Sequence, residues 1–238
     1  MTATVRNPII AALDVASADK AAALATQLAP AVGAFKIGSE LFTAHGPEIV
    51  RRLRATGAHV FLDLKFHDIP NTVAKAIAAA VHLNVQMLTV HTSGGLEMMR
   101  AAEEAAQKAA RDLGQQPPLV LGVTVLTSLS SAAMADLGYP ENIGQQVERF
   151  AALAIKAGLR GLVCSPLELV TLRQSLPREI QLVTPGIRGP GDIQGDQKRT
   201  LSAKEALCAG ANWLVIGRPI YDAANPREAA ENILRSLS

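Results

Sequence analysis

Charged side chains interrupt one short apolar run of the chain at a spacing that suggests acid–base chemistry. The run HVFLDLK, at residues 59–65, carries Asp63 and Lys65, and Asp68 follows soon after. Side chains two residues apart in a strand project to the same side, so a carboxylate and an ammonium would lie next to each other. Opposite charges in a partly dry site hold each other ionised and fix each other's direction. Such a pair is preorganised to handle charge on a substrate.

Polar residues also mark other apolar runs of the chain. Asp14 ends the first run, Lys36 lies inside the second, and Thr127 closes the fifth. A solvated strand end with a surface ion pair would explain a single Asp-x-Lys. Three carboxylates and two lysines from the first three run ends, in a chain with only 18% charged residues, favour a functional site instead.

The apolar runs alternate with longer Ala-rich stretches, a pattern typical of buried parallel strands separated by helices. The runs span residues 9–15, 34–39, 59–65, 86–92, 119–126, 161–165, 181–187 and 213–218. Helices are expected over residues 19–28, 47–56, 72–83, 96–113, 143–157 and 227–237. Eight such units in 238 residues predict an α/β fold, a single (β/α)8 barrel domain over residues 1–238. An open doubly wound sheet is the alternative, although no Gly-x-Gly-x-x-Gly follows the first run.

The last two runs are followed by residues suited to an anion. In this type of barrel the loops after strands seven and eight commonly bind phosphate. Arg188 follows the seventh run, and Gly217 and Arg218 close the eighth. Arginine offers forked donors, and glycine lets backbone N–H groups approach an oxyanion. We expect the Gly-rich residues 189–196 to form a mobile phosphate lid that carries Gln197 onto the ligand, whereas a surface loop with incidental arginines is the simpler alternative.

Composition excludes several classes of partner. The net charge of +2 argues against nucleic acid or an anionic membrane as partner, and 3% aromatic residues argue against base-stacking platforms. Cys164 and Cys208 lie in apolar sequence without disulfide or CxxC spacing, so both are expected to be buried. No signal sequence, membrane span or metal-ligand spacing is found. We therefore expect a soluble cytoplasmic protein without a metal.

These residues together resemble the orotidine 5'-phosphate decarboxylase family in its compact bacterial form. The resemblance rests on ALDV, FKIGSELF and FLDLKFHDIPNTV at the first three runs, VTVLTS at the fifth, TPGIR with GDQKR at the seventh, and VIGRPI at the eighth. It spans nearly the whole chain. It implies a carboxy-lyase that converts orotidine 5'-phosphate to uridine 5'-phosphate (UMP), the last step of de novo UMP synthesis. It also implies that neither a metal nor an organic cofactor takes part.

The resemblance further implies roles for the charged residues. Lys65 would protonate C6 of the pyrimidine, in an array completed by Lys36, Asp63 and Asp68. The chain would form a homodimer with shared active sites. Residues that reach the neighbouring subunit's site would be Asp68, Ile69 and Thr72.

The same resemblance implies the remaining substrate contacts. Asp14 and Lys36 would hold the ribose hydroxyls, and Thr127 would also touch the ligand. The phosphate side would be bound by Arg188, Gln197, Gly217 and Arg218.

Two other functions remain open. One is a metal-dependent sugar-phosphate decarboxylase or aldolase with the same barrel and Asp-x-Lys-x-x-Asp core, such as a keto-gulonate phosphate decarboxylase or a hexulose phosphate synthase. Lys36, and the lack of an added metal-ligating carboxylate in FKIGS, argue against it. The other is a catalytically silent phosphate-ligand sensor. A sensor should lack part of the charged set, which is complete here.

Overall fold

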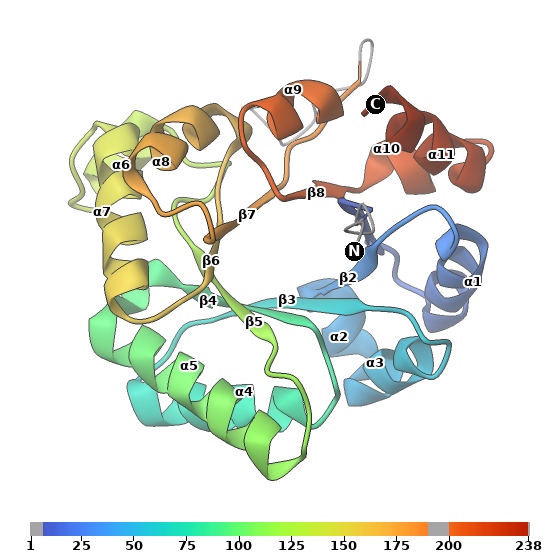
Figure 1. Ribbon diagram of the computed structural model, residues 1–238, viewed down its shortest axis with the longest axis horizontal. Coiled ribbons are helices and arrows are strands. Elements are labelled where there is room, and N and C mark those ends of the chain that lie inside the picture. The colour runs from blue at the N-terminus through green and yellow to red at the C-terminus, as the bar shows by residue number, and fades with distance from the viewer. Residues whose placement is uncertain (1–6, 190–199, 238) are drawn as a thin grey trace, which may run out of the picture.

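The computed structural model describes residues 7–189 and 200–237, and in them eight parallel strands close into a barrel (Figure 1). Each strand pairs with the next along the chain, and β8 returns to pair with β1. The strands are β1 (Ile9–Ala12), β2 (Ala34–Gly38), β3 (Val60–Phe66), β4 (Met87–His91), β5 (Leu119–Val123), β6 (Gly161–Val163), β7 (Gln181–Thr184) and β8 (Trp213–Ile216). Every expected run coincides with a strand, and only β3 extends beyond its run, by the one residue Phe66. The (β/α)8 barrel is therefore confirmed, and the open sheet is wrong.

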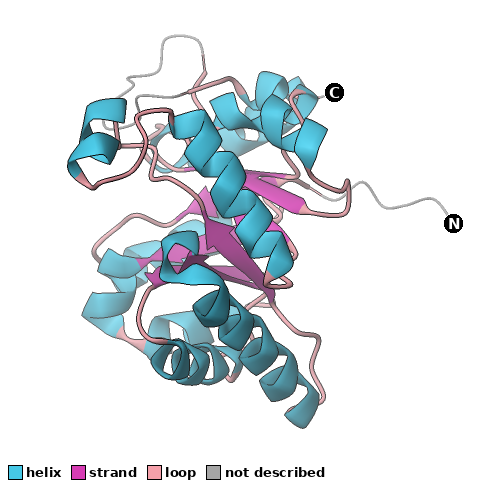
Figure 2. Cartoon of the chain, turned by 90° about the vertical axis from the view of Figure 1, so that its left-hand side faces the viewer, coloured by secondary structure: helices cyan, strands magenta, loops and turns pink. Residues whose placement is uncertain are grey.

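Helices surround the strands on all sides of the ring (Figures 1 and 2). The α-helices are α1 (Ala18–Leu28), α2 (Ser39–His45), α3 (Pro47–Arg54), α4 (Pro70–Val81), α5 (Gly95–Asp112), α6 (Ser131–Asp136), α7 (Ile143–Lys156), α8 (Leu169–Ser175), α9 (Ala203–Cys208), α10 (Arg218–Tyr221) and α11 (Pro226–Ser236). Two 3-10 turns, η1 (Thr92–Gly94) and η2 (Pro166–Glu168), precede α5 and α8. Across the described ranges, none of the helices has the length and apolar character that crossing a membrane requires.

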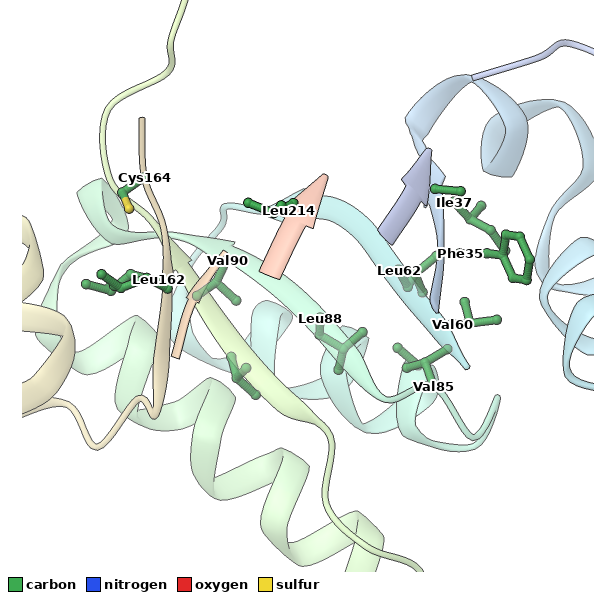
Figure 3. Close-up of a cluster of buried hydrophobic side chains, with 14 of the residues drawn as sticks. Phe35, Ile37, Val60, Leu62, Val85, Leu88, Val90, Leu162, Cys164 and Leu214 are labelled. Carbon is green, nitrogen blue, oxygen red and sulfur yellow. The ribbon is translucent and has the colours of Figure 1, made fainter. Parts of the chain in front are cut away.

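The strands are buried on both faces, which explains why they read as continuous apolar runs. In β3, Val60 and Leu62 belong to the cluster between strands and helices, whereas Phe61 belongs to the cluster inside the barrel. Figure 3 shows part of the outer cluster, in which Phe35 and Ile37 of β2 lie near Val60 and Leu62. Alternation along each strand thus fills two cores at once.

The inward-facing positions turn from apolar to polar toward the carboxyl ends of the strands. In β2 the inward Ala34 is followed two residues later by Lys36, and in β3 Phe61 is followed by Asp63. The corresponding position of β4 is Thr89, which is fully buried. The alternation that fills the barrel therefore also delivers polar groups to its mouth.

The two cysteines differ in burial, although both were expected to be buried. Cys164 is buried as expected, but Cys208 is exposed. The short helix α9 buries Ala203 and Ala206, and Cys208, two residues beyond Ala206, falls on its other side.

Apart from Gly189, the expected lid at residues 189–196 lies outside the described residues, as does Gln197. A single domain over residues 1–238 stays a prediction.

Candidate active site

A cavity of about 560 Å³ lies where strands end and their loops begin. Its walls come from residues at or after the ends of seven of the eight strands, and Phe61 and Val215 of the inner core contribute apolar surface. Most of the predicted site residues line this cavity: Asp14, Lys36, Asp63, Lys65, Thr127, Arg188, Gly217 and Arg218. The cavity volume is typical of sites for small molecules.

The first ion pair of the cavity joins β2 to the loop after β1. Lys36 Nζ donates to Asp14 Oδ1 at 2.8 Å, and Lys36 is only 9% exposed. A Cβ at Gly38 would lie 3.0 Å from Lys36 Nζ, so the glycine leaves room for the ammonium. The pair places a hydrogen-bond acceptor, the carboxylate, beside a hydrogen-bond donor, the ammonium, and together they can bind the hydroxyl groups of a ligand.

The second ion pair lies on β3. Lys65 Nζ donates to Asp63 Oδ2 at 2.9 Å. The closeness of the two side chains is as predicted, but regular strand alternation is not its cause. The register between β3 and β4 shifts after Leu62, and Lys65 has a φ of 51°, in the left-handed region. Such a conformation costs of the order of 1–3 kcal/mol for a non-glycine residue and is concentrated at functional sites.

Two histidines lie beside this pair. The rings of His67 and His91 are 5.4 Å apart at a tilt of 45°. Burial lowers the pKa of His91, and the charges of His67 and Lys65 lower it further, while Asp63 opposes them. A neutral His91 adds no competing cation next to Lys65 at neutral pH.

Three described residues expected to bind phosphate lie on the β7 and β8 side of the cavity: Arg188, Gly217 and Arg218. The Arg188 backbone N–H donates to Leu201 O at 3.0 Å, which ties the start of this loop to the segment before α9. Arg218 begins α10 rather than closing β8, since the strand ends at Ile216. A Cβ at Gly217 would lie 3.3 Å from Tyr221 Cε1, so the backbone and the ring are closely apposed.

Three predicted site residues are not brought to the cavity of their own chain: Asp68, Ile69 and Thr72. Asp68 Oδ1 accepts from the adjacent Ile69 backbone N–H at 2.6 Å. Ile69 is 66% exposed, and Thr72 is exposed in the first turn of α4. All three face outward at the start of one helix.

Other residues of the site were missed by sequence reasoning. Tyr221 lines the cavity, and burial raises its pKa, as do the neighbouring Asp14 and Asp222, whereas Arg218 and Arg188 oppose the rise. Its place one helical turn after Gly217 was an available signal. Among the residues described, no group of three or more His, Cys, Asp or Glu is arranged to hold a metal ion.

Comparison with known proteins agrees with this geometry. The family model described as Orotidine 5'-phosphate decarboxylase / HUMPS family matches residues 7–233. The orotidine 5'-phosphate decarboxylase of Pseudomonas fluorescens is 50% identical over 233 residues, 98% of each chain. That of Opitutus terrae is 49% identical over 96% of this chain and 97% of its own.

Two solved structures of orotidine 5'-phosphate decarboxylases are also similar to this chain. A crystal structure of orotidine 5'-phosphate decarboxylase from Lactobacillus acidophilus superposes with a TM-score of 0.86 at 33% identity, covering 98% of this chain and 99% of that one. The enzyme from Pyrococcus horikoshii gives 0.78 at 28% identity, with 96% and 98% covered. The family match and the full-length relatives agree with the resemblance found in the sequence. The chain belongs to the orotidine 5'-phosphate decarboxylase / HUMPS family.

Proposed function

We propose that this chain decarboxylates orotidine 5'-phosphate to UMP. The observation that carries the proposal is the Asp63–Lys65 pair, which lines the cavity of a chain about half identical, over nearly its full length, to decarboxylases of that name. The cavity is also lined by two arginines, Arg188 and Arg218, whose guanidinium groups suit a phosphorylated substrate.

The order of strands around the barrel supports one orientation of the substrate. Because the ring closes between β8 and β1, the order β7, β8, β1, β2, β3 is continuous. Arg188 and Arg218 lie at one end of this arc and Lys65 at the other, with the Asp14–Lys36 pair between them. A nucleotide fits this arc with its phosphate at the arginines, its ribose at Asp14 and Lys36, and its pyrimidine at Lys65.

The reaction breaks the bond between C6 and the carboxyl group, and both electrons stay on C6. The Lys65 ammonium stabilises this charge as it forms and then gives its proton to C6, so that CO₂ and UMP are the products. Asp63 directs the ammonium by the 2.9 Å contact with its Oδ2. Phosphate contacts far from C6 help to hold the ring against this pair, so remote binding energy serves the chemical step.

We also propose an oligomeric state, a further substrate contact and a cellular compartment for this chain. Three residues expected in the site are exposed and face outward from their own chain: Asp68, Ile69 and Thr72. Their position supports a homodimer in which each chain completes its partner's site. Thr127, which lines the cavity, contacts the substrate. The reaction takes place in the cytoplasm and uses neither a metal nor an organic cofactor.

The test is the loss of orotidine 5'-phosphate absorbance in the presence of a metal chelator. We expect turnover that the chelator does not reduce, and none from a Lys65→Ala chain purified in parallel, which controls for host enzyme. No turnover of this substrate by the parent chain would overturn the proposal. So would a chelator-sensitive reaction with a sugar phosphate, because it would assign the chain to the metal-dependent alternative.

A further inference from the structure

The hydroxyl of Thr89, in β4, bridges both members of the Asp63–Lys65 pair. Thr89 Oγ1 donates to Asp63 Oδ1 at 3.0 Å and accepts from the Lys65 backbone N–H at 2.9 Å. Thr89 is fully buried and does not line the cavity. Because Thr89 does not reach the cavity, it can affect a bound substrate only through Asp63 and Lys65, which do.

The backbone of β3 explains why Lys65 needs this hydroxyl. Leu62 pairs with Leu88, and the next paired residues are Phe66 and Val90. Between these pairs β3 has three residues, 63–65, where β4 has only residue 89, as at a bulge, and a bulge interrupts the backbone hydrogen bonds of a sheet. The N–H of Lys65 donates to the Thr89 hydroxyl instead.

The hydroxyl of Thr89 also fixes the carboxylate of Asp63. Its Oδ1 accepts from Thr89, and its Oδ2 accepts from Lys65 Nζ. The side chain of Asp63 is only 13% exposed, so a carboxylate oxygen that loses its partner gains little compensation from water. The hydroxyl therefore sets the rotation of the carboxylate and, through it, the direction of the ammonium.

We propose that Thr89 is a positioning residue for the decarboxylation, which holds Lys65 and Asp63 in the geometry that delivers the proton to C6. This inference rests on the proposed function. A side chain without the hydroxyl leaves Asp63 Oδ1 and the Lys65 N–H unpaired and frees the strained backbone to relax. Misplacement of a reacting group by about 1 Å can cost 10²-fold in rate.

The experiment compares Thr89→Val, which keeps the shape but removes the hydroxyl, with Thr89→Ser, which keeps the hydroxyl. Thr92→Val is the matched control, because Thr92 is equally buried and its hydroxyl donates to Val123 O at 2.9 Å, away from the charged pair. We expect Thr89→Val to lower kcat by the order of 10²-fold. The dissociation constant for UMP should stay close to that of the parent chain, and Thr89→Ser and Thr92→Val should retain most of the parent kcat.

Two results would overturn the inference: a parent-like kcat in Thr89→Val, or an equal loss of kcat in Thr92→Val, which would indicate a general structural effect. If Thr89→Val does not fold, Thr89→Ala removes the same hydroxyl without adding a methyl group, and the same outcomes decide. An inactive parent chain refutes the proposed function itself. An active parent with an equally active Thr89→Val refutes only the role of Thr89.

Discussion

The two ion pairs of the site present opposite charges to a ligand. In the Asp14–Lys36 pair the lysine side chain is 11% exposed and the aspartate 47%, whereas in the Asp63–Lys65 pair the aspartate is 13% exposed and the lysine 34%. A ligand in the cavity therefore meets the carboxylate of the first pair and the ammonium of the second. This difference supports the proposed roles of Asp14 in hydroxyl recognition and of Lys65 in proton delivery.

Arg218 is expected to act on phosphate alone. Its replacement by Ala removes a charge-assisted hydrogen bond, which contributes about 1.5–3 kcal/mol, so the affinity for UMP should fall roughly 10- to 100-fold. Titration calorimetry with UMP and with uridine measures the effect. Because uridine lacks the phosphate, its affinity should not change, and an equal loss for both ligands would contradict the assignment.

His91 should make stability depend on pH. Since its pKa is lowered in the folded chain, the unfolded chain binds a proton more readily. The free energy of unfolding should therefore fall as the pH drops below the ordinary histidine value of 6.5, and His91→Asn should weaken this dependence. Urea denaturation at about pH 7.5 and 5.5 measures both chains. A His91→Asn chain with an unchanged pH dependence would contradict the prediction.

For single residues, the sequence predicted which side chains form the site better than it predicted their backbone conformation and contacts. Asp63 and Lys65 were identified because charges at the end of an apolar run are costly without a function. The left-handed backbone of Lys65 left no signal, since it depends on the register between β3 and β4. Thr89 was hidden for a related reason: a threonine inside an apolar run is ordinary strand sequence.

At the scale of elements, long helices and strands were predictable and short helices were not. The six expected helices agree with α1, α3, α4, α5, α7 and α11 to within two residues at each end. Helix α2 begins directly after β2 with Gly38 as N-cap and no side-chain cap, so the chain carries no marker between the two. Helix α9 did carry one, because Ser202 and Glu205 form a capping box.

The buried capping box before α8 should contribute more to stability than the exposed one. Ser165 is fully buried, and its hydroxyl, which alanine lacks, accepts from the Leu167 backbone N–H at 3.4 Å, while its backbone N–H donates to Glu168 Oε2 at 2.8 Å. Loss of an N-cap costs about 0.5–2 kcal/mol, and Ser165→Ala should lie at the upper end because Glu168 is also buried.

Thermal unfolding of Ser165→Ala and Ser202→Ala tests this ranking. A chain of this size loses about 2–4 °C in Tm per kcal/mol, so the two variants should be distinguishable. The prediction fails if Ser202→Ala, at the exposed box of α9, lowers the Tm as much as Ser165→Ala.

At the scale of the whole molecule, closure of the barrel creates the site. The pairing of β1 with β8 joins residues from the two ends of the chain, so that Asp14 and Gly217 lie in one cavity. A Cβ at Gly217 would lie 3.6 Å from Asp14 Oδ2. Eight apolar runs that alternate with helical stretches predicted this closure. The proposed completion of the site by a second chain has no signal in the pattern of one chain and was expected only from the family resemblance.

Subunit exchange tests the shared site. Lys65→Ala and Asp68→Ala chains should each be inactive, but a hybrid dimer contains one site with both residues intact. A fully exchanged equal mixture should regain about one quarter of the parent activity, because about half of its dimers are hybrids with one intact site. Verified exchange without recovered activity would contradict donation of Asp68 across the interface.

The most direct test of the account is single-turnover decarboxylation by Lys65→Ala, measured beside its affinity for UMP. The account predicts that no UMP forms above the uncatalysed rate while UMP still binds, because the phosphate and ribose contacts remain. If Lys65→Ala forms UMP at the rate of the parent chain, Lys65 is not the proton donor and the central claim is wrong.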